Sequence, residues 1–258
     1  MPVSICMATF NGQNYLKLQI ASIIEQMAPD DELIVVDDAS TDGTPAYLQG
    51  LSDPRIHITR NEKNLGHVQS FAKAIGLASR QMIFMSDQDD IWVPGRLRAM
   101  CALLAAGSAL VSTNSGFIDA NGQPAPPLQP GLKQCESGSH WTNIWGIFNG
   151  RASYYGCAMA LREELRDIIL PIPPYVESHD LWIAMAANIV NNNQHLERIT
   201  LLRRIHGTNA SVISRPISKK LWSRVVFARS FIQLAVRIML NGSRLRAIQY
   251  NRRILFGL

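Results

Sequence analysis

Several kinds of segment are missing from this sequence, and each absence narrows the class of protein. No uncharged apolar run reaches about eighteen residues, which argues against a membrane-spanning helix. The first residues, MPVSICMATF, show no basic stretch followed by an apolar one, so we expect no signal peptide. Glycine-rich G-x-G-x-x-G and Walker-type loops are also missing, which argues against dinucleotide oxidoreductases and phosphate-loop NTPases.

Cysteine is scarce, with four residues in a chain of 258. The four stand apart from one another, without the paired spacing of a zinc site. Reduced thiols of this kind are typical of cytoplasmic proteins, so we expect a cytoplasmic location. The cysteines are Cys6, Cys101, Cys135 and Cys157.

Acidic residues are absent from the last part of the chain. From Arg215 to Leu258 there are ten Lys or Arg and no Asp or Glu, whereas the first 214 residues hold fifteen basic and twenty acidic residues. The formal net charge of +5 therefore comes from this segment. We predict a main domain over residues 1–214 and a basic amphipathic helical tail over residues 215–258 that meets an anionic surface. The tail carries no recognised nucleic-acid motif, so we expect no nucleic-acid partner.

Strand and helix patterns alternate in the first half of the chain. This order predicts an α/β fold with a mostly parallel central sheet flanked by helices. Later segments add a strand with an Asn-Gly turn, two further strands and a helix that starts near Ser178. The strand patterns are VSICMAT, ELIVVDD, RIHIT, QMIFMSD, GFIDANGQP, GCAMAL and RITLLRRIH, and the helical patterns include YLKLQIASIIEQM, VQSFAKAIGLA, GRLRAMCALLAA and HDLWIAMAANIV.

Polar residues follow the predicted strands at the points where they end. In a parallel sheet these ends share one edge, and ligands bind outside that edge. We therefore expect one polar rim that carries the chemistry. Its members are Thr9 to Gly12, Asp37 and Asp38, Arg60 and Asn61, and Asp87 to Asp90.

The densest part of this rim is MSDQDDIW, which contains Asp87, Asp89 and Asp90. These residues form either a solvated turn before the next helix or a site for a hard divalent cation such as Mg²⁺ or Mn²⁺. Unpaired carboxylates are costly to bury, which favours the cation. Asp38 and Phe10 each allow two interpretations. Asp38 belongs to a turn or accepts a hydrogen bond from a nucleotide, and Phe10 lies in the core or stacks on a base.

Together these motifs resemble those of family 2 glycosyltransferases, which have the glycosyltransferase A fold. The resemblance covers roughly residues 3–212. Within this family the chain resembles the bacterial branch that transfers sugars, often rhamnose, onto surface polysaccharides such as O-antigen. The motifs are VSICMATFNGQNYL, ELIVVDDASTDGT, NLGHVQSFAKAI, MSDQDDIWVPGRL, YYGCAMALREEL, ESHDLW and RRIHGTNAS.

This resemblance implies a nucleotide-diphosphate sugar donor, a dTDP- or UDP-sugar. Phe10 would stack on the base and Asp38 would contact it. Asp87 and Asp89 match the family's Asp-x-Asp motif and are assigned to the metal, Mn²⁺ or Mg²⁺. Asp89 would be the direct ligand and Asp87 would lie nearer the ribose or a metal-bound water, while the intervening Gln88 is expected to be directed away. His206 matches a loop histidine that closes over the diphosphate or the metal. The predicted donor-binding set is Thr9, Phe10, Asn11, Asp38, Asp87 and His206.

The resemblance also assigns the acceptor side. Asp180 in ESHDLW maps to the general base, although the residues alone favour a plain helix start with Ser178 as cap. Gly156, His179 and Trp182 are assigned to the acceptor, and Gly156 either permits close approach of a sugar or marks a bulge. The implied enzyme is an inverting hexosyl- or deoxyhexosyltransferase acting on a glycan or lipid-linked glycan.

Two other functions fit the sequence less well. A sugar-phosphate nucleotidyltransferase would carry a glycine-rich basic loop after the first strand, where this chain has FNGQNY. A non-catalytic glycan- or membrane-binding module would have no need of Asp87, Asp89 and Asp180.

The tail has one apolar stripe at helical spacing. It either packs on the main domain or lies on a membrane with basic residues facing anionic headgroups, and both readings stay open. The second would place the protein at the inner face of the cell membrane. The stripe consists of Leu221, Val225, Ala228, Ile232, Ala235 and Met239.

Overall fold

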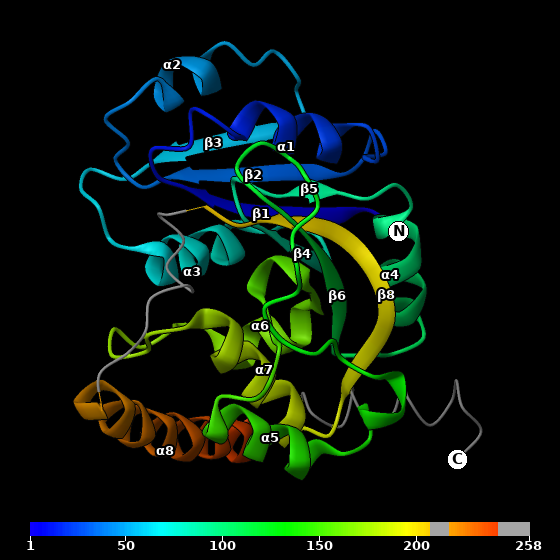
Figure 1. Cartoon of the computed structure of the whole chain (residues 1–258), viewed down its shortest axis with the longest axis vertical. Helices are drawn as coiled ribbons and strands as arrows, with labels where there is room; N and C mark the ends of the chain where they lie inside the picture. The colour runs from blue at the N-terminus through cyan, green and yellow to red at the C-terminus, as the bar shows by residue number, and fades with distance from the viewer. Residues whose placement is uncertain (207–216, 242–258) are drawn as a thin grey trace.

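The computed structural model describes residues 1–206 and 217–241, and an eight-stranded sheet runs through its centre (Figure 1). The strand order is β3-β2-β1-β4-β7-β6-β8-β5. The strands are β1 Val3–Thr9, β2 Glu32–Asp37, β3 Ile56–Arg60, β4 Met82–Ser86, β5 Ile91–Trp92, β6 Leu110–Ile118, β7 Met159–Arg162 and β8 Asn193–Arg204. The helices are α1 Leu16–Ile24, α2 Thr44–Gln49, α3 His67–Leu77, α4 Arg96–Ala105, α5 His140–Asn149, α6 Glu163–Ile169, α7 His179–Ile189 and α8 Ile217–Leu240, with short 3-10 turns η1 Gln134–Glu136 and η2 Gly156–Ala158.

The first four strands form the parallel part of the sheet. β1 lies between β2 and β4 and pairs with both in parallel, and β2 pairs with β3 in the same sense. Their carboxyl ends therefore share one edge, as the sequence predicted. β7 runs antiparallel to both of its neighbours, β4 and β6, and it joins this part to the second half of the sheet.

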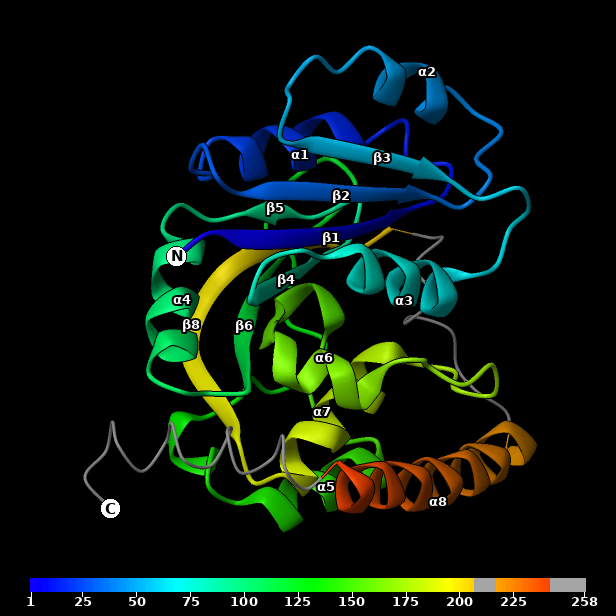
Figure 2. The same ribbon diagram turned by 180° about the vertical axis from the view of Figure 1, so that it is seen from behind.

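Helices cover both faces of the sheet, because the β1 side chains alternate between two apolar cores. Ile5 and Met7 belong to a core with α1, α2 and α4. Cys6, between them, belongs to the other core with α3, α6, α7 and one α8 residue, Leu234. Figure 2 shows α3 and α6 on this second face, with α7 and α8 beyond them.

The second half of the chain differs from the prediction in detail. The strand expected at residues 116–124 begins earlier, at Leu110, and its Asn-Gly turn is present, with the amide of Gly122 donating to the carbonyl of Asp119 at 3.1 Å. β5, α5 and α6 had no assigned pattern. β5 is only two residues long and pairs with β8, so no local periodicity marks it.

The predicted tail forms helix α8, which packs on α6 and α7. Its apolar contacts come from Phe227, Phe231, Leu234 and Ile238, none of which belongs to the predicted apolar stripe. Four members of that stripe are exposed, namely Val225, Ala228, Ile232 and Met239. The predicted boundary at residues 214–215, the last residues 242–258 and the side chain of Leu221 lie outside the described residues. Within the described ranges no helix combines the length and apolar character needed to cross a bilayer.

Candidate active site

The end of β1 is joined to the acidic turn after β4 by a single side chain, Gln88. Its Oε1 accepts hydrogen bonds from Thr9 Oγ1 at 2.6 Å and from the Phe10 amide at 2.8 Å. Its Nε2 donates to the Phe10 carbonyl at 3.1 Å. The Phe10 ring is 44% exposed, so it is free to stack on a planar ligand. The Thr9 hydroxyl is buried and engaged by Gln88, and its contact with a donor stays a prediction.

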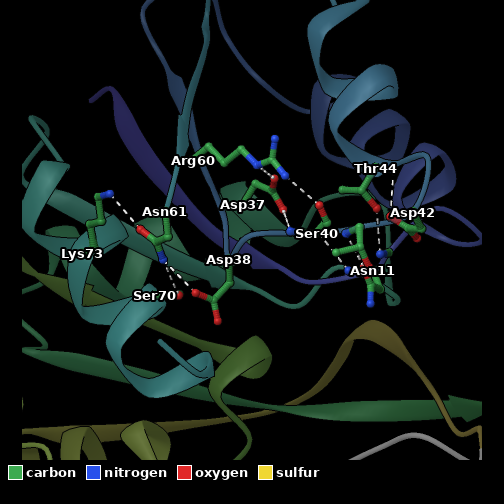
Figure 3. Close-up of polar contacts among 12 residues, drawn as sticks. Asn11, Asp37, Asp38, Ser40, Asp42, Thr44, Arg60, Asn61, Ser70 and Lys73 are labelled. Carbon is green, nitrogen blue, oxygen red and sulfur yellow. Dashed lines mark hydrogen bonds and ion pairs between the residues drawn. The ribbon is translucent and has the colours of Figure 1, made fainter. Parts of the chain in front are cut away.

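Asn11 connects the loop after β1 to the loop after β2 through hydrogen bonds (Figure 3). Its backbone has φ 50, a left-handed conformation that asparagine tolerates better than most residues. Its amide donates to Ser40 Oγ at 2.9 Å, and its Oδ1 accepts from the Thr41 amide at 2.9 Å. Asn11 therefore shapes the rim, and its contact with a donor stays a prediction.

Asp38 is buried and holds the loop that precedes α3. Its Oδ1 accepts from Asn61 Nδ2 and the Leu65 amide, and its Oδ2 accepts from the Gly66 amide, each at 2.8 Å. Figure 3 shows Asp38 beside Asn61, whose Oδ1 accepts from Lys73 at 2.8 Å. Burial raises the pKa of Asp38, but the hydrogen bonds outweigh it and leave the pKa below its usual value. Asp38 thus stays ionised at the rim, and its contact with a base stays a prediction.

Three carboxylates gather after β4. Burial and the neighbouring charge of Asp89 raise the pKa of Asp87 to about 6. Burial and the charges of Asp87 and Asp89 raise the pKa of Asp90 well above its usual value. Asp90 Oδ1 accepts from the Arg204 amide at 3.1 Å. Among the described residues Asp90 Oδ2 has no hydrogen-bond partner. Burial and the closeness of the carboxylates to one another therefore disfavour the ionised forms of Asp87 and Asp90.

This cluster fits a divalent cation. Ligand atoms of Asp87, Asp90 and Cys157 lie within 4.8 Å of one another. Burial raises the pKa of the Cys157 thiol well above its usual value, so oxygen atoms are the donors available at neutral pH. Carboxylate oxygens suit Mg²⁺ and Mn²⁺. Cys157 carries no local sequence signal of membership in this cluster, because it is far from the carboxylates in the chain and reaches them through η2.

Asp89 lies beside His206, although the two residues are far apart in the sequence. Asp89 Oδ2 and His206 Nε2 are 2.7 Å apart. The His206 ring stacks on Tyr15, with ring centroids 5.1 Å apart. Arg204 donates to the Asp89 carbonyl at 3.0 Å and lies over the Tyr15 ring. The structure therefore brings two predicted residues together at the end of β8, and adds Tyr15.

Asp180 is the second residue of α7, and this helix contacts η2, which contains Cys157 of the cluster. Its Oδ1 accepts from the Leu181 amide at 2.8 Å and from the Ser178 hydroxyl. Ser178 is the N-cap of α7, as the residues alone suggested. The negative charge of Asp180 also contributes to the raised pKa of Asp87, so the two carboxylates share one electrostatic environment. Asp180 is therefore both a helix-start residue and a neighbour of the acidic cluster.

His179 is buried and fills the space that Gly156 leaves. Its ring stacks on Phe71 with centroids 4.3 Å apart and meets the edge of His67 at 5.7 Å. A Cβ on Gly156 would lie 2.5 Å from His179 Nε2. Burial lowers the pKa of His179 to about 4, and within the described part of the chain neither ring nitrogen has a hydrogen-bond partner. Gly156 thus permits close approach of a histidine ring.

Trp182, which the sequence analysis assigned to the acceptor, lies in the core. Its side chain is 1% exposed and its Nε1 donates to the Ile169 carbonyl at 3.0 Å. A residue with this burial cannot contact an acceptor in this conformation, so we give Trp182 a packing role.

Near the cluster, Arg203 lies 4.2 Å over the Tyr155 ring and its charge lowers the pKa of Asp87. Arg203 is therefore a basic group of the site.

Comparison with known proteins identifies the fold. The family model described as "Glycosyl transferase family 2" matches residues 4–167, well over half of the chain. Solved structures of TarS from S. aureus are similar over the whole fold. One, in complex with UDP-GlcNAc, has a TM-score of 0.65 and 17% identity, and the match covers 100% of this chain and 80% of that one. This likeness confirms the glycosyltransferase A architecture.

Named bacterial proteins are similar over somewhat less than half of the chain. A putative teichuronic acid biosynthesis glycosyltransferase, TuaG of Bacillus subtilis, is 31% identical over 125 residues, which is 47% of this chain and 50% of that protein. The Escherichia coli protein WfgD, named a UDP-Glc:alpha-D-GlcNAc-diphosphoundecaprenol beta-1,3-glucosyltransferase, is 32% identical over 102 residues, 40% of each chain. The matched regions span half or less of these relatives.

Proposed function

The chain belongs to glycosyl transferase family 2, and we propose that it transfers a sugar from a nucleotide diphosphate to a hydroxyl of a glycan or lipid-linked glycan in bacterial surface-polysaccharide synthesis. The observation that carries this proposal is the packing of His179, which precedes Asp180, against Gly156, whose neighbour Cys157 lies with Asp87 and Asp90. A candidate base therefore lies near a carboxylate cluster that would hold a cation. This is the arrangement that glycosyl transfer from a diphosphate requires.

Phe10 and Asp38 would hold the donor. The exposed Phe10 ring offers a stacking surface, and the ionised Asp38 offers an acceptor for a base imide or a ribose hydroxyl. The TarS structures contain UDP and UDP-GlcNAc, which supports a uridine or thymidine nucleotide as the donor of this chain. Arg203 lies near the cluster, where a guanidinium would face the diphosphate.

Asp87 and Asp89 would hold Mn²⁺ or Mg²⁺, with His206 beside Asp89 and Asp90 facing Asp87. A bound divalent cation supplies positive charge that offsets the charge of a departing diphosphate. Protonation of Asp87 competes with cation binding, because only the ionised carboxylate is a good ligand. The raised pKa of Asp87 thus makes donor binding sensitive to mildly acidic pH.

Asp180 would act as the general base. It takes the proton of an acceptor hydroxyl while the hydroxyl oxygen forms a bond to the anomeric carbon. The bond from that carbon to the diphosphate oxygen breaks, and its electron pair leaves with the nucleotide diphosphate. One displacement inverts the anomeric centre, and no covalent enzyme intermediate is needed. The hydrogen bonds from Leu181 and Ser178 to Oδ1 leave Oδ2 to receive the proton.

The acceptor is proposed to be a sugar on a lipid carrier or a growing glycan. The name of one relative, WfgD, includes a diphosphoundecaprenol-linked sugar as acceptor. The name of a second relative, TuaG, refers to teichuronic acid biosynthesis. Rhamnose or another deoxyhexose is one donor class within this proposal, and glucose and N-acetylglucosamine are others. His179 and Gly156 are buried against each other, so they would shape the start of α7 through packing rather than contact the acceptor.

Turnover of a panel of UDP- and dTDP-sugars tests this function, with Mn²⁺ and with EDTA. We expect release of the nucleotide diphosphate with Mn²⁺, and loss of activity in EDTA. Asp180→Asn should lower turnover about 10²–10⁴-fold, the range for a positioned base. Its melting temperature and donor affinity should hardly change, because the Asn oxygen still accepts from Leu181.

Asp53→Asn is the matched control. Asp53 also accepts a backbone hydrogen bond, from the Arg55 amide at 2.9 Å, but it precedes β3 at the opposite edge of the sheet. Turnover of this variant should equal that of the unchanged protein. Release of pyrophosphate instead of a nucleotide diphosphate would indicate a nucleotidyltransferase. Binding of sugar nucleotides without any turnover would indicate a non-catalytic module.

A further inference from the structure

Helix α8 carries apolar side chains on two opposite faces. One face packs on the domain through Phe227, Phe231 and Leu234. The other faces solvent, where a surface helix normally carries polar residues. Its residues recur at intervals of three, four and seven and so form one stripe along the helix. The exposed stripe consists of Trp222, Val225, Ile232, Val236 and Met239.

Helix α5 adds two exposed tryptophans beside α8, and the Trp141 ring lies near Phe231 with ring centroids 6.3 Å apart. Trp141 is 70% and Trp145 is 62% exposed. The two helices lie side by side (Figures 1 and 2), since Phe148 of α5 meets Phe227 with ring centroids 5.2 Å apart. We call Trp141, Trp145 and the exposed stripe of α8 the α5–α8 face.

The distribution of tryptophan sets this face apart from the rest of the surface. The chain has five tryptophans. Trp222, Trp141 and Trp145 are exposed and belong to the α5–α8 face, whereas Trp92 and Trp182 are buried in the two cores. Exposed tryptophan is enriched where a protein meets the headgroup region of a membrane, because its ring is apolar and its N–H is polar.

Basic groups accompany these aromatic residues. Arg224 lies 4.4 Å over the Phe148 ring, between α8 and α5. Arg229 is exposed within the stripe and lies 4.0 Å over the Tyr175 ring. The whole segment from Arg215 onward has ten basic and no acidic residues. An anionic surface complements this charge, and an apolar one complements the tryptophans.

We propose that the α5–α8 face docks on an anionic lipid bilayer, with α8 lying in the plane of the headgroups. In Figure 2 the start of α8 and the carboxyl ends of β2 and β3 lie on the same side of the molecule, with α8 at the bottom and the two strands near the top. The inference rests on the proposed function only for its purpose, delivery of a lipid-linked acceptor. Docking itself requires no donor.

Quenching of tryptophan fluorescence by brominated lipid tests the proposal on the full chain. Vesicles contain phosphatidylglycerol mixed with phosphatidylcholine that has brominated acyl chains, and control vesicles contain the brominated phosphatidylcholine alone. We expect partial quenching with the anionic vesicles, because the three exposed tryptophans reach the acyl chains and Trp92 and Trp182 do not. Binding should weaken as salt rises, since exposed charges are screened over about 8–10 Å.

A triple variant and a matched control locate the contact. Trp222→Ser, Ile232→Ser and Met239→Ser together should lower vesicle affinity by about tenfold or more, because apolar area no longer enters the bilayer. Leu18→Ser, Leu77→Ser and Ile199→Ser replace three exposed apolar residues elsewhere and should leave it unchanged. Arg224→Gln with Arg229→Gln should lower it by about fivefold per residue, the equivalent of about 1 kcal/mol each.

Several outcomes would overturn the proposal. They are a lack of quenching by anionic vesicles, equal quenching by the two kinds of vesicle, and equal losses in the triple variant and its control. Light scattering that shows a dimer of the unchanged chain and a monomer of the triple variant would assign the face to a second copy instead. Donor turnover in detergent-free buffer is measured separately and should survive in the triple variant. A failure of the proposed function would appear in that assay and leave vesicle binding in place.

Discussion

Replacement of Gly156 by alanine is a sharp test of how the site is packed. The new Cβ would lie 2.5 Å from His179 Nε2, and 3.3 Å from both His179 Cδ2 and Met85 Cε. The distance to Nε2 is well inside van der Waals contact, so the histidine ring must move. It has little room, because it is buried and stacked on Phe71 at 4.3 Å.

The size of the effect follows from this geometry. Overpacking of a well-filled core costs about 1–3 kcal/mol. For a chain of this length each kcal/mol lowers the melting temperature by about 2–4 °C, so we expect a decrease of about 2–12 °C. Turnover should fall further, by up to about a hundredfold, because His179 is the first residue of α7 and its displacement moves Asp180.

Scanning calorimetry and donor turnover measure the two effects. Gly76→Ala is the matched control: its Cβ would lie 3.8 Å from Leu170 Cδ1, inside helix α3, so it should stabilise the protein by about 0.5–1 kcal/mol. A double-mutant cycle with His179→Ala identifies the clash. If Gly156→Ala destabilises the protein equally with and without the histidine ring, the reasoning is wrong.

Two further expectations concern single side chains of the site. His179→Gln should flatten the pH dependence of the unfolding free energy between about pH 4 and 6.5, measured by chemical denaturation at several pH values. Burial lowers the pKa of His179 to about 4, so the unfolded state takes up the proton first and the native protein loses stability as the pH falls through this window; an unchanged slope would exclude His179 as the cause. Gln88→Leu should weaken binding of UDP or dTDP in a titration calorimeter by about tenfold while the fold survives, because the Phe10 loop loses both of its backbone hydrogen bonds to that side chain; unchanged affinity would show that the loop keeps its shape without them.

The parallel half of the fold was predictable from the sequence, for a physical reason. β1, β2 and β4 are short apolar runs that end in polar residues, and a strand buried on both faces needs such a run. β3 is less buried, but it lies between turn residues and was still recognisable. β5 was not predictable, because two residues carry no periodicity and its pairing partner is far away in the chain.

The site was predictable to a similar extent. The placement of Thr9, Asp38 and Asp87 at one edge follows from parallel pairing alone. The stacking of Tyr15 on His206 and the approach of Cys157 to the carboxylates depend on how distant loops pack, and no local signal records that. The direction of the tail stripe was open for the same reason. The sequence showed that α8 has an apolar stripe, but only packing decides which face of a helix turns inward.

The bridge formed by Gln88 has a consequence for any comparison or redesign of related chains. The middle residue of the Asp-x-Asp motif in this chain links the ends of the first and fourth strands through its side chain. Residues 9–10 and 86–90 thus form one transplantable unit. A chimera that exchanges either segment alone would leave Thr9 or Gln88 without its partner, so a change of donor preference would require both segments to be exchanged together.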